Sequence, residues 1–236
     1  MKKPQLVSVI LPSFNERDNL LLLIPRIASV IGRLSHWRVE IIVVDDNSPD
    51  KTAATLKKMF GARIRLIVRK NTRGLGSAIA TGILKANGEV IIGMDADGNH
   101  DPKYIPALLA ALDTSDLAVG SRFVSGGGMA DRSRYVMSRM FNLCMCFFGF
   151  PVSDSTSGYY AVKKRILGNL GIDKIYYGYG EYHLRLVWLA KKQGIHITEI
   201  PVYYGVRRYG QSKSRLPIML ITYMRAALRL VFGATS

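Results

Sequence analysis

The sequence predicts an α/β protein in which helices cover both faces of a mostly parallel β-sheet. Short apolar runs alternate with segments of helix length over residues 6–122. The runs are rich in Val and Ile and do not alternate with polar residues, which is typical of strands that are buried on both faces. Polar and acidic residues directly follow four of these runs. In a parallel sheet such strand ends meet at one edge, where ligands bind.

The first elements follow one another as strand, helix, strand, helix and strand. Leu6–Pro12 is a continuous apolar run that ends near a proline, and Val39–Asp46 is a second run that ends in two aspartates. Asn19–Leu34, between them, has the length and apolar content of a helix. Asp50–Phe60 predicts the next helix, because an acidic residue in the first turn complements the positive end of the helix dipole. Arg63–Arg69 is the third strand.

The alternation continues to the middle of the chain. Gly74–Ala86 is rich in small residues, which favours close packing of a helix on the sheet. Glu89–Asp95 is the fourth strand, Tyr104–Leu112 a helix and Asp116–Arg122 the fifth strand. The segment Gly74–Ile79 also matches the glycine pattern of dinucleotide-binding folds, but it follows the third strand, whereas that pattern follows the first. We therefore attribute the small residues to packing and not to NAD binding.

The second half of the chain loses this regular order. Ser133–Phe150 and Leu216–Gly233 are expected to be helices with long apolar faces. Gly180–Gly194 is expected to be an amphipathic helix that a glycine closes. Asp154–Lys164 predicts a loop followed by a strand. Ile195–Gly210 predicts a strand pair or a bent strand, because a proline interrupts it.

The composition indicates an anionic partner. The 236 residues carry a net charge of +16, with 15 Lys and Arg against 10 Asp and Glu in residues 1–101 and 18 against 7 in residues 102–236. Nucleic acid, a phosphorylated substrate and an acidic lipid surface would all suit this excess. Cys144 and Cys146 lack a second Cys or His pair, so they are expected to be reduced and buried, as in a cytosolic protein. No apolar stretch has the form of a signal peptide or the length of a spanning helix.

The fourth strand ends in two aspartates that could hold a cation. Asp95 and Asp97 are two residues apart, so in an extended chain their side chains point to the same side. Asn99 could add a carbonyl oxygen, and oxygen ligands suit Mg²⁺ or Mn²⁺. The same residues also suit a turn that ends the strand. The acidic ends of the first two strands, which should lie nearby, favour the cation, because such a cluster needs neutralisation.

Seven segments, in order and across nearly the whole chain, carry a family resemblance. They are SVILPSFNERDNL, EIIVVDDNSPDKT, GLGSAIATGILKANGEVIIGMDADGNHDP, VGSRFVSGGG, SRYVMSRMFN, DSTSGYYAVKK and RRYGQSKS. With them the chain resembles the inverting glycosyltransferases of family 2, and within these the dolichol-phosphate mannose synthase branch. The family has the GT-A fold, a Rossmann-like, mostly parallel sheet flanked by helices. After Asp-Ala-Asp the branch usually has an apolar residue and then Gln or Ser, whereas Gly98 and the shorter Asn99 stand here.

The resemblance implies a site for a nucleotide sugar and a metal ion. The residues that would contact the base and ribose are Pro12, Phe14, Glu16, Asp45 and Asp46. Asp95, Asp97 and Asn99 would hold Mg²⁺ or Mn²⁺ on the donor diphosphate, where the cation acts as a Lewis acid on the leaving group. A structural role is compatible with this assignment, because Ser48 or Asp50 could cap the following helix.

It also implies two groups of basic residues. Those that would bind the phosphate of the acceptor are Arg122, Arg134 and Ser138, of which the last two lie one helical turn apart. Guanidinium groups suit this role because they bind phosphate bidentately and keep their charge. Arg208 and Lys213 would lie in a mobile segment that closes over the donor diphosphate, and Arg207 is an adjacent competitor for that position.

The expected reaction needs placement more than a strong base, because a phosphate acceptor is already nucleophilic near neutral pH. Asp97 and Arg122 are therefore the expected catalytic residues. His100 and Asp101 could act together as a base, but we expect His100 to be a structural hydrogen-bonding group. Asp154 lies near the site in the family, with acceptor and sugar both open as its partner.

The resemblance implies inverting transfer of a hexose, with mannose from GDP-mannose as the first expectation, to a polyprenyl phosphate such as dolichyl or undecaprenyl phosphate. The same chemistry with a UDP-sugar that carries glucose, N-acetylglucosamine or an aminosugar is the alternative. A basic nucleic-acid-binding module is a distant alternative, since it explains the charge but not the acid cluster. We expect no nucleic acid as partner.

An acceptor of this kind lies in a bilayer. We expect a GT-A catalytic domain over residues 1–215 and a C-terminal amphipathic, membrane-proximal helix over residues 216–236. The apolar side of Leu216–Phe232, that of Ser133–Phe150 and the basic second half would suit an anionic membrane surface, although both helices could instead form core or dimer contacts. The protein is thus expected at the cytoplasmic face of a membrane as a peripheral protein, alone, as a homo-oligomer or with a membrane-anchoring subunit.

Overall fold

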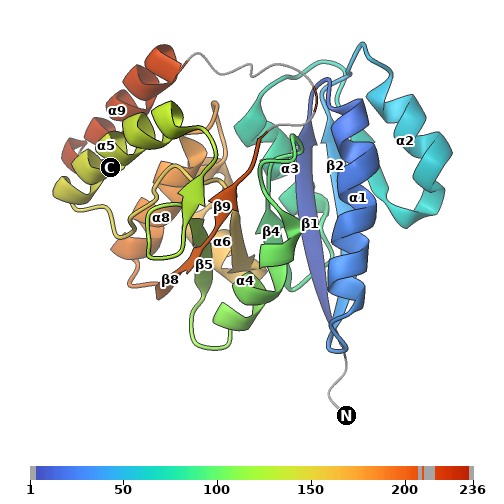
Figure 1. Ribbon diagram of the computed structural model, residues 1–236, viewed down its shortest axis with the longest axis horizontal. Helices are drawn as coiled ribbons and strands as arrows, with labels where there is room; N and C mark the ends of the chain where they lie inside the picture. The colour runs from blue at the N-terminus through green and yellow to red at the C-terminus, as the bar shows by residue number, and fades with distance from the viewer. Residues whose placement is uncertain (1–3, 207–208, 210–215, 234–236) are drawn as a thin grey trace.

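A seven-stranded sheet forms the centre of the molecule, and helices lie on both of its faces (Figure 1). The structure is a computed structural model, and it describes residues 4–206, 209 and 216–233. In chain order the strands of this sheet are β1 (Gln5–Ser13), β2 (Trp37–Asp45), β3 (Arg65–Val68), β4 (Val90–Gly93), β5 (Leu117–Ser121), β7 (Tyr160–Lys163) and β8 (Ile197–Pro201). Their spatial order is β3-β2-β1-β4-β7-β5-β8. A second, two-stranded sheet pairs β6 (Gly128–Met129) with β9 (Tyr203–Tyr204).

The large sheet is parallel except at β7, which runs antiparallel to both of its neighbours, β4 and β5. The sequence predicts a strand in this segment but not its insertion between the fourth and fifth strands. After β5 the chain passes through the loops and helix at the carboxyl edge of the sheet and enters β7 from that edge, so β7 points the opposite way. The insertion places residues 153–159 beside the carboxyl end of β5.

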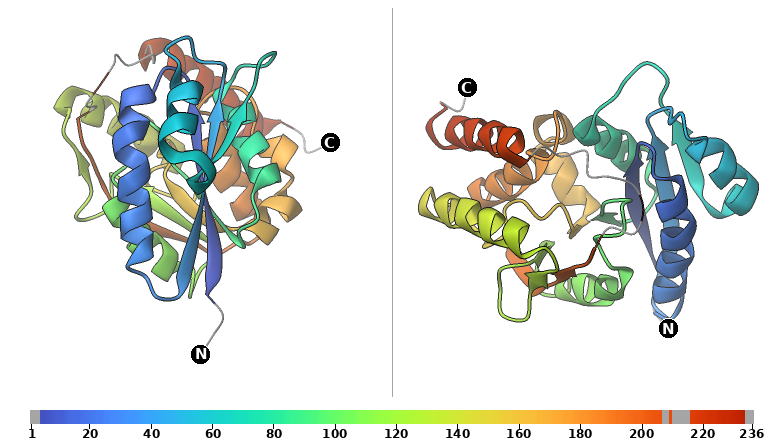
Figure 2. Two further views of the ribbon diagram at one scale, coloured as in Figure 1. Left: turned by 90° about the vertical axis from the view of Figure 1, so that its right-hand side faces the viewer. Right: turned by 45° about the horizontal axis from the view of Figure 1, so that its top comes forward.

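The helices form two layers (Figures 1 and 2). One face of the sheet packs against α1 (Arg17–Gly32), α2 (Thr52–Phe60) and α4 (Ile105–Ala111). The other face packs against α3 (Leu75–Lys85), α6 (Lys164–Leu170), α7 (Ile172–Ile175), α8 (Tyr182–Lys192), α5 (Arg132–Phe147) and α9 (Leu216–Phe232). Two 3-10 turns, Gly61–Arg63 and Pro102–Tyr104, precede β3 and α4.

The central strand β1 supplies both layers of the core. Val7, Val9 and Leu11 point to the α1 face and Ile10 to the α3 face, all with 0% exposure. The predicted burial of both faces is therefore confirmed for β1. Each such side chain contributes about 1.5–3 kcal/mol on burial. The prediction is wrong for β3, where Val68 is 41% exposed, because β3 lies at the edge of the sheet.

Two further predictions, the close packing of α3 on the sheet and the reduced, buried state of the two cysteines, are only partly confirmed. Gly82 of α3 lies against the sheet as predicted, since an added Cβ would stand 2.5 Å from Ile10. Gly76 instead allows the backbone of Tyr177 to approach, at 2.7 Å from such a Cβ. Cys144 and Cys146 are free thiols, as expected, but their predicted burial is wrong, because Cys144 is only partly buried and Cys146 is exposed. Within the described ranges, no helix combines the length and hydrophobicity that crossing a bilayer requires.

Gly93 at the end of β4 provides a test of the packing at the centre of the sheet. A Cβ at this position would stand 2.4 Å from the ring of Tyr160, which is itself fully buried. We expect Gly93→Ala to lower the free energy of unfolding by about 1–3 kcal/mol, because the ring cannot move without disturbing the core. Urea unfolding followed by circular dichroism measures the change.

The matched control is Gly168→Ala in α6, where an added Cβ meets no atom within 4 Å. Alanine is the better helix former, so this variant should be as stable as the wild type or slightly more stable. Equal destabilisation by both substitutions would contradict the packing argument.

Candidate active site

Two adjoining cavities open at the carboxyl edge of the sheet. One, of about 320 Å³, is lined mainly by residues that follow β1 and β2 and by the start of α3; we term it the β1 cavity. The other, of about 160 Å³, is lined by Arg122, residues 156–158 and the first turns of α5; we term it the α5 cavity. The residues that line both are Leu75, Asp95, Asp97 and Tyr179. The two cavities therefore meet at the predicted cation site.

The end of β1 forms the wall of the β1 cavity, as the sequence predicts. Pro12, Phe14 and Glu16 all line it. The guanidinium of Arg73 lies over the Phe14 ring, 4.7 Å from its centroid, and Asn19 donates a hydrogen bond of 2.7 Å to Glu16. Ser13 also lines the cavity, and its buried hydroxyl has no hydrogen-bond partner in the described part of the chain. An orphan hydroxyl of this kind is suited to a polar ligand.

The two aspartates at the end of β2 differ in their burial and contacts. Asp46 lines the β1 cavity and forms a buried ion pair with Arg69, whose Nε donates to it at 2.7 Å. Its second oxygen accepts from the amide of Gly74 at 2.9 Å, which fixes the start of α3. Asp45 is fully buried and lines neither cavity, because both its oxygens accept from Ser48. Their predicted contacts with a nucleotide stay predictions, and the geometry favours Asp46.

Asp50 supports the start of α2 as predicted, although the N-cap position of this helix is Lys51, which makes no side-chain cap hydrogen bond. Oδ1 of Asp50 accepts from the amide of Thr52 at 2.9 Å, in the first turn of α2. Ser48 has another task. Its hydroxyl donates to Asp45 at 2.5 Å and accepts from the amide of Asn15 at 2.9 Å. The ends of β1 and β2 are thereby joined.

The turn after β4 is supported by a buried histidine. The amide of Asp95 donates to Nδ1 of His100 at 2.8 Å, and the ring stacks on Tyr159 with 4.8 Å between the centroids. Burial lowers the pKa of His100 from 6.5 to about 4, although the carboxylate of Asp97 acts in the opposite direction. The ring is therefore neutral at pH 7. The predicted structural role of His100 is confirmed, and Asp101 is not its partner but pairs with Arg26 at 2.9 Å.

The oxygen ligands at this turn suit a hard divalent cation. Asp95 and Asp97 line both cavities, so a cation between them could also reach a ligand in either one. In the described chain no cluster of three or more His, Cys, Asp or Glu has the arrangement of a metal site. Two carboxylates are enough for Mg²⁺, which binds to few protein groups and completes its shell with water and phosphate oxygens. The residues present therefore fit the predicted metal.

Asn99 has a less direct relation to this site. It lines the α5 cavity, but its side-chain nitrogen donates to one oxygen of Asp97 at 2.9 Å and its amide to the other at 3.0 Å. In this arrangement Asn99 orients the carboxylate of Asp97. Its role as a metal ligand stays a prediction.

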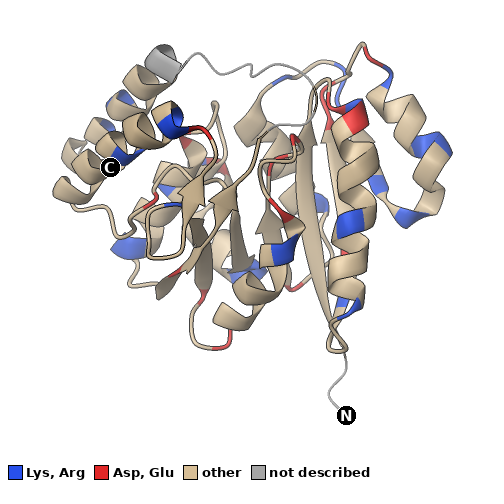
Figure 3. Cartoon of the chain, in the orientation of Figure 1, with Lys and Arg blue, Asp and Glu red and all other residues tan. Residues whose placement is uncertain are grey.

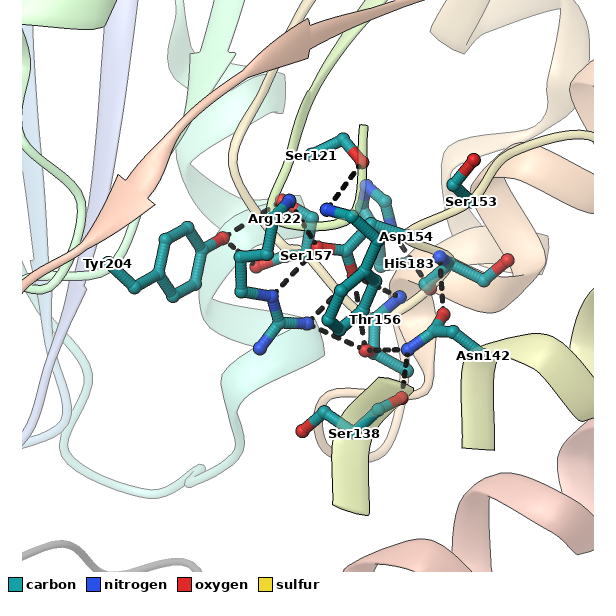
Figure 4. A network of polar contacts seen from close by, with 12 residues as sticks. Ser121, Arg122, Ser138, Asn142, Ser153, Asp154, Thr156, Ser157, His183 and Tyr204 are labelled. Carbon is teal, nitrogen blue, oxygen red and sulfur yellow. Dashed lines mark hydrogen bonds and ion pairs between the residues drawn. The ribbon is translucent and has the colours of Figure 1, made fainter. Parts of the chain in front are cut away.

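Arg122, at the end of β5, lies in a buried ion pair (Figure 4). Its Nε and Nη2 each donate to Asp154 at 2.7 Å, and its backbone amide donates to the same carboxylate at 3.0 Å. Burial by itself would lower the pKa of Arg122 and raise that of Asp154, but their mutual attraction reverses both shifts, so both groups stay charged. Asp154 is thus the partner of Arg122. The sequence did not reveal this pair, since acceptor and sugar are the two partners that it leaves open for Asp154.

The remaining surroundings of Arg122 orient it toward the α5 cavity. Nη2 also donates to the hydroxyl of Thr156 at 2.9 Å, and the guanidinium lies 4.8 Å from the centroid of the Tyr204 ring. Within the described ranges, Nη1 makes no hydrogen bond to the protein and can meet an anion. Arg134 and Ser138 of α5 line the same cavity. The three predicted acceptor-phosphate residues are therefore brought together, although their roles stay predictions.

Asp131 explains why α5 begins beside this cavity. It is the N-cap of the helix and accepts from the amide of Arg134 at 3.0 Å, which lowers the pKa of its carboxyl. Arg207, Arg208 and Lys213 lie outside the described residues, so the predicted closing segment has no structural account.

Sequence reasoning missed several residues of this site. Arg69, Asn142, Thr156, Tyr179 and Tyr204 all contribute through contacts between distant segments. Only Asn142 had a visible signal, since it follows Arg134 and Ser138 at the same spacing of four residues on a helix.

The family of the chain follows from comparison with known proteins. Residues 8–171 match the family model of glycosyl transferase family 2. This range covers well over half of the chain, begins within β1, continues past β7 and includes the acidic ends of β1, β2 and β4. The chain belongs to glycosyltransferase family 2, in agreement with the resemblance seen in its motifs.

The sequence relatives are more specific than the family. The chain is 34% identical to a polyprenol monophosphomannose synthase of Mycolicibacterium smegmatis over 90% of its own length and 82% of the relative. It is 32% identical to a dolichol-phosphate mannosyltransferase of Pyrococcus furiosus over 95% of its own length and 63% of the relative. It is also 32% identical to an undecaprenyl-phosphate mannosyltransferase of Micrococcus luteus over 88% of its own length and 86% of the relative.

Solved structures show the same fold at lower sequence identity. Glucosyl-3-phosphoglycerate synthase from Mycobacterium tuberculosis, in complex with Mn²⁺, UDP-glucose and glycerol 3-phosphate, superposes with a TM-score of 0.71 at 18% identity, over 96% of this chain and 80% of that one. The same enzyme with Mg²⁺ and UDP gives 0.70 at 19% identity, over 96% and 79%. At this identity the likeness establishes the GT-A fold.

His183 of α8 gives this site region a measurable pH dependence. Burial lowers its pKa from 6.5 to about 4. Its Nδ1 donates to the carbonyl of Ser155 at 2.9 Å, while its buried Nε2 has no partner in the described chain, so a second proton there would be an unpaired charge. The unfolded chain binds that proton at the ordinary pKa. The free energy of unfolding should therefore fall as the pH is lowered from about 6.5 to about 4.

We expect His183→Asn to remove up to about 3 kcal/mol of this pH dependence, because its amide can keep the hydrogen bond to Ser155 but cannot titrate. Urea unfolding at intervals between pH 7.5 and pH 4 measures it. His100 retains its own contribution in the variant, so part of the slope should remain. A slope equal to that of the wild type would disprove the assignment to His183.

Proposed function

We propose that this protein transfers mannose from GDP-mannose to the phosphate of a polyprenyl phosphate, with inversion at the sugar carbon. The three mannose-transferring relatives, each matched over 88% or more of this chain, support the sugar and the acceptor class. UDP-sugars are the alternative donors, because the structural neighbours that share the fold bind UDP-glucose. The much higher identity of the mannose-transferring relatives favours GDP-mannose.

One observation carries the proposal. A pair of carboxylates suited to a cation lines both of two adjoining cavities, and three groups suited to a phosphate line only one of them. Both substrates are phosphorylated anions that repel each other. A transferase that joins them needs a cation at one end of the reaction axis and fixed basic groups at the other, and the two cavities provide this arrangement.

In this mechanism the nucleotide lies in the β1 cavity. Glu16 and Asp46 are acceptors for base N–H groups or ribose hydroxyls, and Phe14 offers an apolar face. Asp95 and Asp97 would hold Mg²⁺ or Mn²⁺, which neutralises charge on the departing diphosphate. Asn99 keeps the Asp97 carboxylate oriented through its hydrogen bonds.

The acceptor phosphate lies in the α5 cavity. Arg122 and Arg134 neutralise it, and Ser138 can donate a hydrogen bond. Arg122 is held by Asp154, so its free edge is presented in a defined direction and little ordering is needed when the phosphate binds. A phosphate oxygen then attacks the sugar from the side opposite the diphosphate. No protein base is required, which agrees with the buried, neutral state of His100.

The outer sides of α5 and α9 suit a bilayer surface. The two helices lie side by side, with 6.3 Å between the ring centroids of Phe148 and Phe232. Their exposed apolar residues, which we term the α5–α9 surface, are Val136, Met137, Met140, Leu143, Phe147, Ile221, Leu228 and Phe232. Exposed arginines flank them, including Arg225 and Arg229, and basic positions on both helices are visible in Figure 3. We propose that this surface lies on an anionic membrane next to the α5 cavity.

The side of the membrane and any partner subunit follow only from the family resemblance. We propose the cytoplasmic face, where nucleotide sugars are present, with the protein peripheral and alone, as a homo-oligomer or on a membrane-anchoring subunit. The division into a catalytic domain over residues 1–215 and a C-terminal helix over residues 216–236 stays a prediction. In the structure α9 contributes the buried Tyr223 and Ala227 to the core under α8.

The decisive experiment is a transfer assay with radiolabelled donors. With Mn²⁺ or Mg²⁺ and a polyprenyl phosphate in detergent, GDP-mannose should give a labelled lipid, and UDP-glucose and UDP-N-acetylglucosamine should not. In a parallel thermal-shift panel with Mn²⁺, GDP should raise the melting temperature more than UDP. Labelled lipid from a UDP-sugar alone would establish the alternative donor, and no labelled lipid from any donor would refute the transferase proposal.

The carboxylate pair is tested in the same assay. Asp97→Ala should lower kcat at least about 100-fold, because it removes a charged ligand from the leaving-group site. Asp113→Ala is the matched control, since Asp113 is an exposed carboxylate before β5, at the opposite edge of the sheet. Turnover of the Asp97 variant close to that of the Asp113 variant would exclude the metal role.

Binding to vesicles tests the α5–α9 surface. Phe147 is 87% exposed, so Phe147→Asp should weaken binding to vesicles of phosphatidylglycerol and phosphatidylcholine about tenfold by placing a charge in the apolar contact. Leu84→Asp is the control, because Leu84 is 66% exposed on α3, outside this surface. Co-sedimentation gives the bound fraction. Equal binding of the two variants would place the membrane contact elsewhere.

A further inference from the structure

Asn142 lies on the buried side of α5, and its side chain points toward Thr156 (Figure 4). It is 1% exposed, and its amide makes three hydrogen bonds. The nitrogen donates to the carbonyl of Ser138 at 2.8 Å and to the hydroxyl of Thr156 at 2.9 Å, and the oxygen accepts from the amide of Ser155 at 2.7 Å. Both donor hydrogens are used, so the orientation of the amide is determined. Asn142 thus joins α5 to the segment after residue 153.

The hydroxyl of Thr156 links Asn142 to the buried ion pair. It accepts from Asn142 and from Nη2 of Arg122, each at 2.9 Å, and it lies 3.3 Å from Oδ1 of Asp154, to which it can donate. The hydroxyl has one hydrogen and two lone pairs, so these three contacts use its full capacity. A displacement of Asn142 would leave one of these groups buried without its partner.

The same segment is held from its other side by the sheet. Glu199 of β8 accepts from the amides of Ser153 and Asp154, at 2.8 and 3.1 Å. Besides Arg122 itself, the segment around Asp154 is therefore held by Glu199 from the sheet, by His183 from α8 and by Asn142 from α5. Of these, only Asn142 belongs to an element that also carries an exposed apolar surface.

A second contact joins α5 to the backbone next to Arg122. Arg139 donates to the backbone carbonyl of Phe123 at 2.7 Å, and its guanidinium lies 5.5 Å from the centroid of the Phe123 ring. Phe123 directly follows Arg122 in the chain. The helix therefore contacts the backbone after Arg122 and the side chains that hold its guanidinium.

We propose that Asn142 is a positioning residue for the acceptor phosphate, an inference that rests on the proposed function of the α5 cavity. Asn142 does not line the cavity. It acts through Thr156 and Asp154 on the direction of the free Nη1 of Arg122, and it fixes α5, which carries Arg134 and Ser138. The helix that forms the α5–α9 surface thereby also sets the geometry of the phosphate site.

The test measures acceptor affinity directly. A water-soluble, ten-carbon isoprenyl phosphate is titrated into the protein by calorimetry, and its KM is measured with GDP-mannose as donor. For Asn142→Ala we expect the Kd and KM for this phosphate to rise about tenfold, because the phosphate-binding groups lose their common geometry. The Kd for GDP with Mn²⁺ should stay within about twofold, because the β1 cavity does not depend on Asn142.

Variants of Thr156 identify the route. Thr156→Val removes the hydroxyl and should weaken the binding of the isoprenyl phosphate as much as Asn142→Ala does. The double variant should bind it little more weakly than either single variant, because each of the three variants breaks the hydrogen bond between residues 142 and 156. Thr156→Ser restores a hydroxyl and should recover most of the affinity. Additive losses in the double variant would contradict the proposed route.

Ser8→Ala is the control for the general effect of losing a buried polar group far from the α5 cavity. The Ser8 hydroxyl is fully buried at the amino end of the sheet, where it donates to Glu40 at 2.5 Å and accepts from the amide of Gly88 at 2.9 Å. Ser8→Ala should lower the melting temperature without changing the Kd for the isoprenyl phosphate. If Asn142→Ala behaves like Ser8→Ala, Asn142 is merely structural and the proposal is wrong.

The outcomes separate this proposal from the proposed function. Failure of the wild type to bind the isoprenyl phosphate would refute the function of the α5 cavity and the role of Asn142 with it. Binding by the wild type with unchanged affinity in Asn142→Ala and Thr156→Val would refute the positioning role alone. If Asn142→Ala does not fold, Thr156→Val and Thr156→Ser carry the same comparison.

Discussion

The buried ion pair of Arg122 and Asp154 is the interaction on which the geometry of the candidate site depends. Asp154 has no exposed surface, so its charge requires the guanidinium and the amide of Arg122 as partners. Loss of one partner from such a pair leaves an uncompensated charge and typically costs about 3–5 kcal/mol. The end of β5 and the segment that precedes β7 must therefore stay together. The antiparallel insertion of β7 beside β5 is the feature of the fold that makes this contact possible.

Apart from the buried ion pairs and Arg73, charges of opposite sign occupy different halves of the same sheet edge. Carboxylates follow β1, β2 and β4, while arginines follow β5 and begin α5. Buried basic partners already hold the carboxylates that shape the fold, such as Asp46 with Arg69. Asp95 and Asp97 stand at the boundary between the halves. The edge can thus accept two anionic groups, one through a cation and one through guanidinium groups, without direct repulsion between them.

Helix α5 serves three surfaces at once. Its outer side is apolar and exposed, its inner side packs Phe141 and Met145 into the core, and a third stripe carries Arg134, Ser138 and Asn142 at intervals of four residues. A helix can meet these demands together because residues four apart share a face. The consequence is that the proposed membrane contact, the core and the proposed phosphate site share one helix.

The sequence by itself determined the α/β class, the order of most elements and the family. Strand and helix lengths and unbroken apolar runs report burial directly, and the positions of Asp95, Asp97, Arg122 and Arg134 at strand ends and a helix start follow from that order. It could not show that β7 inserts between β4 and β5, that Asp45 turns inward to Ser48, or that Cys146 is exposed.

Only the tertiary structure decided which polar groups meet. Arg122 finds Asp154 across 32 residues and Asp46 finds Arg69 across 23, and Asn142 reaches Thr156 from another element. A local pattern reports whether a residue is buried, but the partner of a buried charge is set by the packing of distant segments, and its orientation follows from the hydrogen bonds that this packing allows.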